Sequence, residues 1–217
     1  MKINNKEIKA IIFDLDGTLL DSTGMWKEID KKFFAKRNME VPPQYAEEIV
    51  HIGLKESAIL TKEKYGVKES VEEILKEWND ASMNMYLYEI PLKPFVIELL
   101  EKCKKENIKM AVATANSKEL YEPCLKRLNI YHYFDFLGDV NMVNEGKSSV
   151  KLYNHVASKL NESPENIAVF EDISIGLKTA YENGYISVAV FDANAKKDDE
   201  RKRKYSYLYV NSFDELL

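Results

Sequence analysis

The chain has 217 residues, of which 45% are hydrophobic and 31% are charged, and its formal net charge is −5. This apolar content is typical of a globular protein and excludes a disordered chain. The slightly acidic balance argues against a general nucleic-acid binder, which is usually basic. No apolar run approaches the roughly 20 residues that a membrane span needs, and the N-terminus shows no signal-peptide pattern.

The cysteines and histidines carry no pattern typical of a secreted protein or a zinc protein. Two cysteines, Cys103 and Cys124, are too few for a disulfide framework, and we expect both to be reduced thiols. The three histidines lack the spacing of zinc ligands: His51, His132 and His155. We expect a cytoplasmic, monomeric protein with neither a nucleic-acid nor a membrane partner.

Short apolar runs rich in β-branched residues alternate with helical patterns along most of the chain. The apolar runs predict buried strands at 8–13, 108–114, 167–170 and 186–191. The helical spacing of apolar residues predicts helices after Pro94 and at 117–129, 149–160 and 175–183. This alternation predicts an α/β fold with a Rossmann-like parallel sheet and helices on both faces.

One stretch, 23–89, breaks the alternation because it has no convincing buried strand. Its apolar residues recur at helical spacing in two stripes: Trp26, Ile29, Phe33 and Phe34, then Val71, Ile74, Leu75, Trp78 and Met85. We interpret them as the core of a small helical bundle, an inserted cap in a catalytic α/β core formed by 1–22 and 90–217. The dense charge run 196–204 is interpreted as a solvated helix face.

Two carboxylates follow the first predicted strand, in the sequence Asp14-Leu15-Asp16-Gly17-Thr18. In open α/β sheets, ligands bind beyond the carboxyl ends of the strands. Carboxylates gathered there repel one another unless a cation offsets them, and Mg²⁺ prefers oxygen ligands. An acidic turn that merely closes a strand is the alternative interpretation.

The other predicted strand ends also carry polar groups. Thr114 ends one strand, Glu171 and Asp172 end another, and Lys147 lies between them in the sequence. Each has an ordinary alternative, since threonine often caps a helix, a Glu-Asp pair can form a polar turn and most lysines are solvated.

Taken together, these residues resemble the four motifs of the haloacid dehalogenase-like hydrolase superfamily, in the same order. The most specific matches are the segment 13–19 and Phe170-Glu171-Asp172 with Gly176. The resemblance covers essentially the whole chain, and the helical insertion falls where many family members carry a helical cap.

The resemblance implies a role for each matched residue. Asp14 would be the nucleophile that forms an aspartyl phosphate, and Asp16 would be the general acid and base. Mg²⁺ would be held by Asp14, the backbone carbonyl of Asp16 and Asp172, with Glu171 near the metal directly or through water. The phosphoryl oxygens would be held by Thr114, Ala115, Asn116 and Lys147.

The chain departs from the family pattern at two places. Family members often show Pro-x-Pro-Asp after the motif lysine, whereas Ser148 to Lys151 follow Lys147 here. A serine is usual after the Glu-Asp pair, and this chain has Ile173. Neither change removes a group with a direct chemical role.

The resemblance implies a Mg²⁺-dependent phosphatase acting on a small phosphorylated metabolite, such as a sugar phosphate. A β-phosphoglucomutase-type phosphomutase is the main alternative, and a catalytically silent binding protein is the third. Thr18 and the lack of an arginine in the segment 51–57 favour the phosphatase. The candidate substrate contacts on the cap are Trp26, His51 and Lys55.

Overall fold

The structure is a computed structural model of the chain and describes residues 2–3, 6–49 and 54–217. Backbone contacts divide the chain into two compact units. The larger unit comprises Met1–Thr23 and Ile90–Leu217, and the smaller comprises Gly24–Glu89.

The larger unit is built on a six-stranded sheet in the order β5-β4-β3-β6-β7-β8, with every pair of neighbours parallel. The strands are β3 (Ala10–Phe13), β4 (Lys109–Thr114), β5 (Phe136–Asp139), β6 (Ile167–Glu171), β7 (Ile186–Val190) and β8 (Leu208–Val210). A separate antiparallel pair is formed by β1 (Lys2–Ile3) and β2 (Lys6–Glu7). The predicted Rossmann-like parallel sheet is confirmed.

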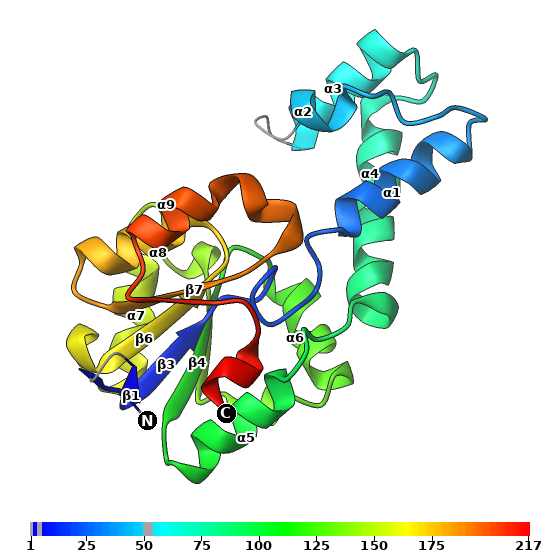
Figure 1. Ribbon diagram of the computed structural model, residues 1–217. Helices are drawn as coiled ribbons and strands as arrows, with labels where there is room; N and C mark the ends of the chain where they lie inside the picture. The colour runs from blue at the N-terminus through cyan, green and yellow to red at the C-terminus, as the bar shows by residue number, and fades with distance from the viewer. Residues whose placement is uncertain (1, 4–5, 50–53) are drawn as a thin grey trace. The chain divides into compact units, whose positions relative to one another are not determined.

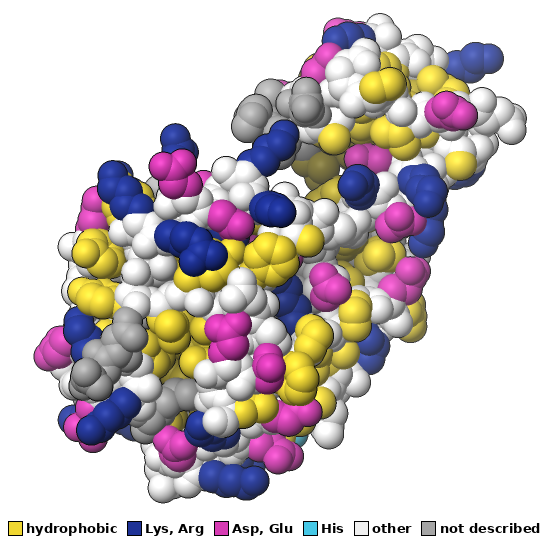
Figure 2. Space-filling view, viewed as in Figure 1, with side chains coloured by type: hydrophobic (Ala, Val, Ile, Leu, Met, Phe, Trp, Pro, Cys, Tyr) yellow, Lys and Arg dark blue, Asp and Glu magenta, His cyan; other side chains and the backbone are white. Residues whose placement is uncertain are grey.

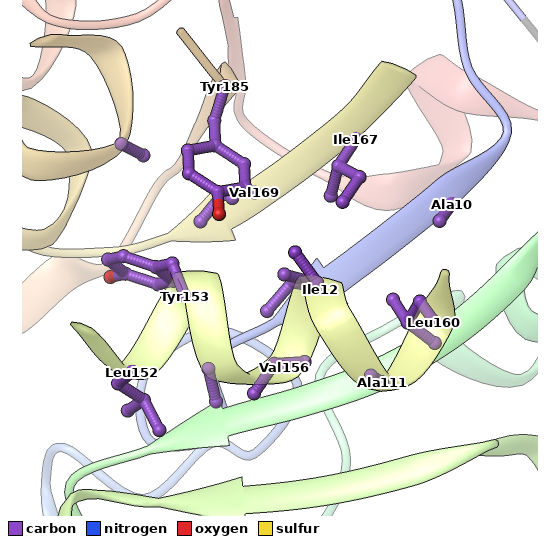
Figure 3. Close-up of a cluster of buried hydrophobic side chains, with 13 residues drawn as sticks. Ala10, Ile12, Ala111, Leu152, Tyr153, Val156, Leu160, Ile167, Val169 and Tyr185 are labelled. Atoms are coloured by element: carbon purple, nitrogen blue, oxygen red, sulfur yellow. The ribbon is translucent and has the colours of Figure 1, made fainter. Parts of the chain in front are cut away.

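Helices cover both faces of this sheet (Figure 1). They are α5 (Val96–Lys105), α6 (Lys118–Arg127), α7 (Lys151–Leu160), α8 (Ser174–Glu182) and α9 (Asp199–Lys204), with short turns η2 (Tyr131–Tyr133), η3 (Val140–Met142), η4 (Pro164–Asn166), η5 (Ala193–Asp198) and η6 (Phe213–Leu216). Ile12 and Val169 lie in one buried cluster with Val156 of α7 (Figure 3). Successive strand residues point to opposite faces, so Phe170 lies on the other face, 6.2 Å from the ring of Phe213 in η6.

The register of the central strands brings three chain segments to one edge of the sheet. Phe13 of β3 lies opposite Val112 of β4 and Phe170 of β6. The residues that follow these positions, Asp14 and Glu171 among them, therefore lie at the same end of the sheet. Ligands of open parallel sheets bind at this end.

The smaller unit consists of α1 (Met25–Ala35), α2 (Tyr45–Ile49), α3 (Leu54–Tyr65), α4 (Val71–Asn84) and the π-helical turn η1 (Met85–Glu89). Its core is aromatic, with Phe34 in edge contact with Tyr45 and Tyr65, and Phe33 packed on Trp78. At the start of α4, the Ser70 side chain accepts from the Glu73 N–H and the Glu73 carboxylate accepts from the Ser70 N–H. Such a capping box satisfies two backbone donors at a helix start.

The structure differs from the sequence interpretation at the two sheet edges and in the charge run. The sequence interpretation does not include strands β5 and β8, which are edge strands of only four and three residues that each begin with two half-buried positions. The interpretation of 196–204 as wholly solvated is wrong for Lys202, which is completely buried. Its ammonium lies 2.8 Å from the Asp199 carboxylate, which offsets part of the cost of burying the charge.

Charged side chains of both signs are spread over the face of the molecule seen in Figure 2. None of the helices in the described part of the chain is long and apolar enough to cross a membrane. Cys103 and Cys124 are both free cysteines, and both are buried.

A buried carboxyl group, Asp30, lies on α1 in the smaller unit. Burial raises the pKa of Asp30 to about 6. Within the described residues no cation pairs with it, and the titratable group recorded near it is the Tyr45 phenol, which stays neutral because burial raises its pKa. The ionised form of Asp30 is therefore costly in the folded protein.

This burial predicts a stability that falls as pH rises. The pKa of an aspartate in an unfolded chain is near 3.9, so between about pH 4 and pH 6 the folded state binds the extra proton. We expect Asp30→Asn to be more stable than wild type by about 2 kcal/mol at pH 8, and the gain to vanish near pH 4. Urea unfolding followed by circular dichroism measures this, with the exposed Asp80→Asn as the matched control. An equal gain at both pH values would contradict the assignment.

Candidate active site

The turn after β3 is shaped by hydrogen bonds and by one glycine. The Asp14 N–H donates to the Phe170 carbonyl at 3.0 Å, which fixes Asp14 beside the end of β6. Gly17 has φ +80°, a backbone conformation that favours glycine. A Cβ at Gly17 would clash with the Asp172 carboxylate and would lie 2.7 Å from the Thr23 methyl carbon. The glycine therefore permits the two acidic segments to approach closely.

Three carboxylates and one ammonium meet at this edge of the sheet. The Lys147 ammonium forms ion pairs with Asp14 Oδ1 and with Glu171 Oε1, the latter at 2.6 Å. Asp14 and Lys147 are almost completely buried, Asp172 is 3% exposed and Glu171 is fully buried. Asp14, Glu171 and Asp172 each offer an oxygen within 4.8 Å of the others. Residues far apart in the sequence thus form one buried, charged cluster.

The positive charge of this cluster falls short of its negative charge. Burial raises the pKa of Asp14 well above its usual range; Lys147 lowers it, while Glu171 and Asp172 raise it further. Burial and Glu171 likewise raise the pKa of Asp172 to about 7. Burial alone would lower the pKa of Lys147, but Asp14 and Glu171 raise it above its usual value. A further cation would lower the pKa of both aspartates and keep them ionised.

The same cluster fits a divalent metal ion. Lys147 and Tyr153 both donate to Oε1 of Glu171. The other oxygen, Oε2, is buried and has no hydrogen-bond partner in the part of the chain that the structure describes. Leaving such an oxygen without a partner is costly, and Mg²⁺ binds carboxylate oxygens. The donor set therefore fits Mg²⁺.

Asp16 is held through both of its carboxylate oxygens. The Ser22 hydroxyl donates to Oδ1 at 2.6 Å, and the Asn116 amide donates to Oδ2 at 3.1 Å. The carboxylate of Asp16 therefore has a defined orientation beside the cluster.

The nucleophile candidate has a weaker contact nearby. Thr18 Oγ1 donates to Asp14 Oδ2 at 3.5 Å, at the limit of a hydrogen bond.

The last residue of β4 and the two residues after it are the three expected to bind phosphoryl oxygens together with Lys147. Thr114 ends β4 and is fully buried, and its hydroxyl accepts from the Asn116 N–H at 3.0 Å. Ala115 is exposed between them. The Asn116 side chain reaches Asp16, a contact that sequence reasoning did not anticipate.

The candidate substrate contacts of the smaller unit have different outcomes. Trp26 is 41% exposed on α1, and Lys55 is exposed on α3. His51 lies outside the described residues. These positions do not test whether any of the three residues contacts the substrate.

Two residues at the site edge were missed by sequence reasoning. Tyr153 contacts Glu171 from α7, and nothing in the sequence marks this pair. Asp192 accepts from the Thr23 hydroxyl at 2.8 Å and pairs with the Lys93 ammonium at 2.9 Å. Asp192 follows β7, so the rule that polar residues at carboxyl ends of strands form sites could have found it.

Comparisons with known proteins place the chain in a family. Residues 11–190 match the model of the haloacid dehalogenase-like hydrolases. A phosphorylated carbohydrates phosphatase of Thermotoga maritima is 28% identical over 82% of this chain and 82% of its own length. The β-phosphoglucomutase of Bacillus subtilis is 28% identical over 84% of this chain and 83% of its own length.

Solved structures agree with this assignment. A Thermotoga maritima protein described as a candidate β-phosphoglucomutase superposes with a TM-score of 0.81 at 26% identity, over 94% of both chains. A β-phosphoglucomutase from Clostridium difficile superposes with a TM-score of 0.69 at 25% identity, over 97% of this chain and 93% of the other. The predicted resemblance and the expectation of an enzyme are confirmed. The chain belongs to the haloacid dehalogenase-like hydrolase family.

Proposed function

We propose that the chain is a Mg²⁺-dependent phosphatase that hydrolyses a small phosphorylated carbohydrate through an aspartyl-phosphate intermediate. The observation that carries this proposal is the buried cluster of Asp14, Lys147, Glu171 and Asp172 at the carboxyl end of the sheet. The relative that is named a phosphorylated carbohydrates phosphatase supports the substrate class.

In this proposal Asp14 is the nucleophile. One oxygen of its carboxylate attacks phosphorus, and the bond from phosphorus to the leaving sugar oxygen breaks. Lys147, which now pairs with Asp14 and Glu171, would also bind the phosphoryl oxygens. Thr114, Ala115 and Asn116 would contribute a hydroxyl and N–H groups at the adjacent strand end.

Asp16 serves as the general acid and base. It gives a proton to the leaving sugar oxygen, then takes one from the water that attacks phosphorus and frees Asp14. The hydrogen bonds from Ser22 and Asn116 support this role because they orient both oxygens of the carboxylate.

The metal would be held by Asp14, Asp172 and the backbone carbonyl of Asp16, with Glu171 directly or through water. When bound, Mg²⁺ would offset the charge of the phosphoryl group and of the carboxylates around it. The unpartnered Oε2 of Glu171 supports this assignment, and so does the pKa of Asp172, which burial and Glu171 raise to about 7.

The helical unit 24–89 is proposed to act as a cap that selects the substrate. Its two connections to the larger unit are paired: the Asp21 N–H donates to the Pro91 carbonyl, and the Lys93 N–H to the Leu19 carbonyl. The second connection, at 91–93, is therefore paired with the segment 19–21, which directly follows the turn after Asp14. Trp26, His51 and Lys55 remain candidate substrate contacts on this unit.

A β-phosphoglucomutase activity is the second candidate, favoured by the matches to proteins of that name. Thr18 and the lack of an arginine in 51–57 still favour the phosphatase, because mutases use such an arginine to hold the distal phosphate.

Removing the nucleophile should abolish hydrolysis. We expect Asp14→Asn to lower the turnover of p-nitrophenyl phosphate by on the order of 10³-fold or more, because an amide is a poor nucleophile. The exposed Asp214→Asn is the matched control and should keep wild-type turnover. Activity of Asp14→Asn within a few-fold of wild type would contradict its role.

Removing the metal should also abolish hydrolysis. We expect EDTA to stop turnover and added Mg²⁺ to restore it. Because the unfolded chain lacks the site, Mg²⁺ should also raise the Tm of the protein. Asp172→Asn should need more Mg²⁺ for both effects. Full activity in EDTA would reject the metal while leaving the role of Asp14 intact.

The products should distinguish the two candidate functions. With β-glucose 1-phosphate and Mg²⁺, followed by ³¹P NMR, we expect inorganic phosphate without accumulation of glucose 6-phosphate. Glucose 6-phosphate formed faster than phosphate would favour the mutase.

A further inference from the structure

A tyrosine outside the family motifs contacts the buried cluster. Tyr153 lies in the first turn of α7 and is fully buried against the sheet (Figure 3). Its hydroxyl donates to Oε1 of Glu171 at 2.8 Å, the same oxygen that the Lys147 ammonium approaches at 2.6 Å. Two donors therefore converge on one carboxylate oxygen and leave the other, Oε2, without a partner in the described structure.

Packing alone does not explain this contact. Tyr185 is fully buried in the same hydrophobic cluster, with its ring centroid 6.0 Å from that of Tyr153. Its hydroxyl donates to the neutral amide oxygen of Asn154 at 2.7 Å. A buried hydroxyl needs a partner, but a neutral one suffices. Tyr153 instead uses a carboxylate of the candidate active site, which makes a stronger, charge-assisted hydrogen bond.

A glycine of α8 leaves the space that this pair occupies. A Cβ at Gly176 would lie 2.6 Å from Glu171 Cδ and 2.8 Å from the Tyr153 hydroxyl oxygen, too close for either to remain in place. Glycine is a poor helix former, so its presence within α8 disfavours the helix while permitting the contact. Three elements, α7, β6 and α8, thus meet at the Tyr153–Glu171 hydrogen bond.

We propose that Tyr153 is a positioning residue that holds Glu171 with Lys147, so that Oε2 is presented to the divalent cation. Tyr153 itself touches neither substrate nor metal in this proposal. The inference rests on the proposed function, because it assumes that the cluster binds Mg²⁺. Groups that orient metal ligands through hydrogen bonds typically change metal affinity by about 10- to 100-fold when they are removed.

The test is Mg²⁺ binding by metal-free protein, measured by isothermal titration calorimetry. We expect Tyr153→Phe to bind Mg²⁺ about 10-fold more weakly than wild type, and Tyr185→Phe, the matched control, to bind with wild-type affinity. The Mg²⁺ concentration for half-maximal turnover should rise in parallel, while kcat at saturating Mg²⁺ stays within about twofold of wild type.

A double variant shows whether Tyr153 acts through Glu171. Added to Glu171→Gln, Tyr153→Phe should cause no further loss of Mg²⁺ affinity, whereas an independent effect would add. The inference is overturned if Tyr153→Phe keeps wild-type affinity, if Tyr185→Phe weakens binding equally, or if the two losses add. It is also overturned if Tyr153→Phe loses its native circular dichroism spectrum, because the hydroxyl is then a structural group. A wild-type protein that binds no Mg²⁺ would overturn the proposed function itself.

Discussion

The shortage of positive charge around three buried carboxylates is the constraint on which this site depends. Asp14, Glu171 and Asp172 are brought together by the parallel register of β3 and β6, and among the described residues Lys147 is the cation that forms ion pairs with this cluster. Burying like charges together costs stability unless a cation offsets them. The arrangement is therefore costly for folding, and this cost is consistent with the proposal that a cation and a phosphoryl group bind there.

Much of this arrangement could be predicted from sequence because it follows from strand patterning. The runs 10–13 and 167–170 are continuously apolar, as is typical of strands buried on both faces, so the polar residues directly after them stand out. Parallel strands end at one edge, which brings Asp14 and Glu171 together without knowledge of the tertiary structure. Lys147 required the family resemblance, since a lysine in a loop has no periodic context and is usually solvated.

Features that arise from packing between distant elements could not be predicted. The Tyr153–Glu171 hydrogen bond joins α7 to β6, and the aromatic residue alone reads as an ordinary core position. Lys202 lies in a run of charges, yet it is buried because Asp199 and the ring of Tyr209 surround its ammonium. The edge strands β5 and β8 have only four and three residues, which is too short to give a clear pattern.

Asp192 shows what a fully compensated carboxylate looks like at the same edge of the sheet. Although burial acts to raise its pKa, the ammonium of Lys93, the hydroxyl of Thr23 and the N–H of Asn194 lower it below the usual value. Burial and neighbouring carboxylates instead raise the pKa of Asp172, which Asp192 itself influences. Asp172 and Asp192 are both 3% exposed, and the pKa of each shifts in the direction set by the groups around its carboxylate. Asp192 has an ammonium and two further donors of its own, whereas Asp14 must share the Lys147 ammonium with Glu171. A bound cation would supply the positive charge that the proposed site requires.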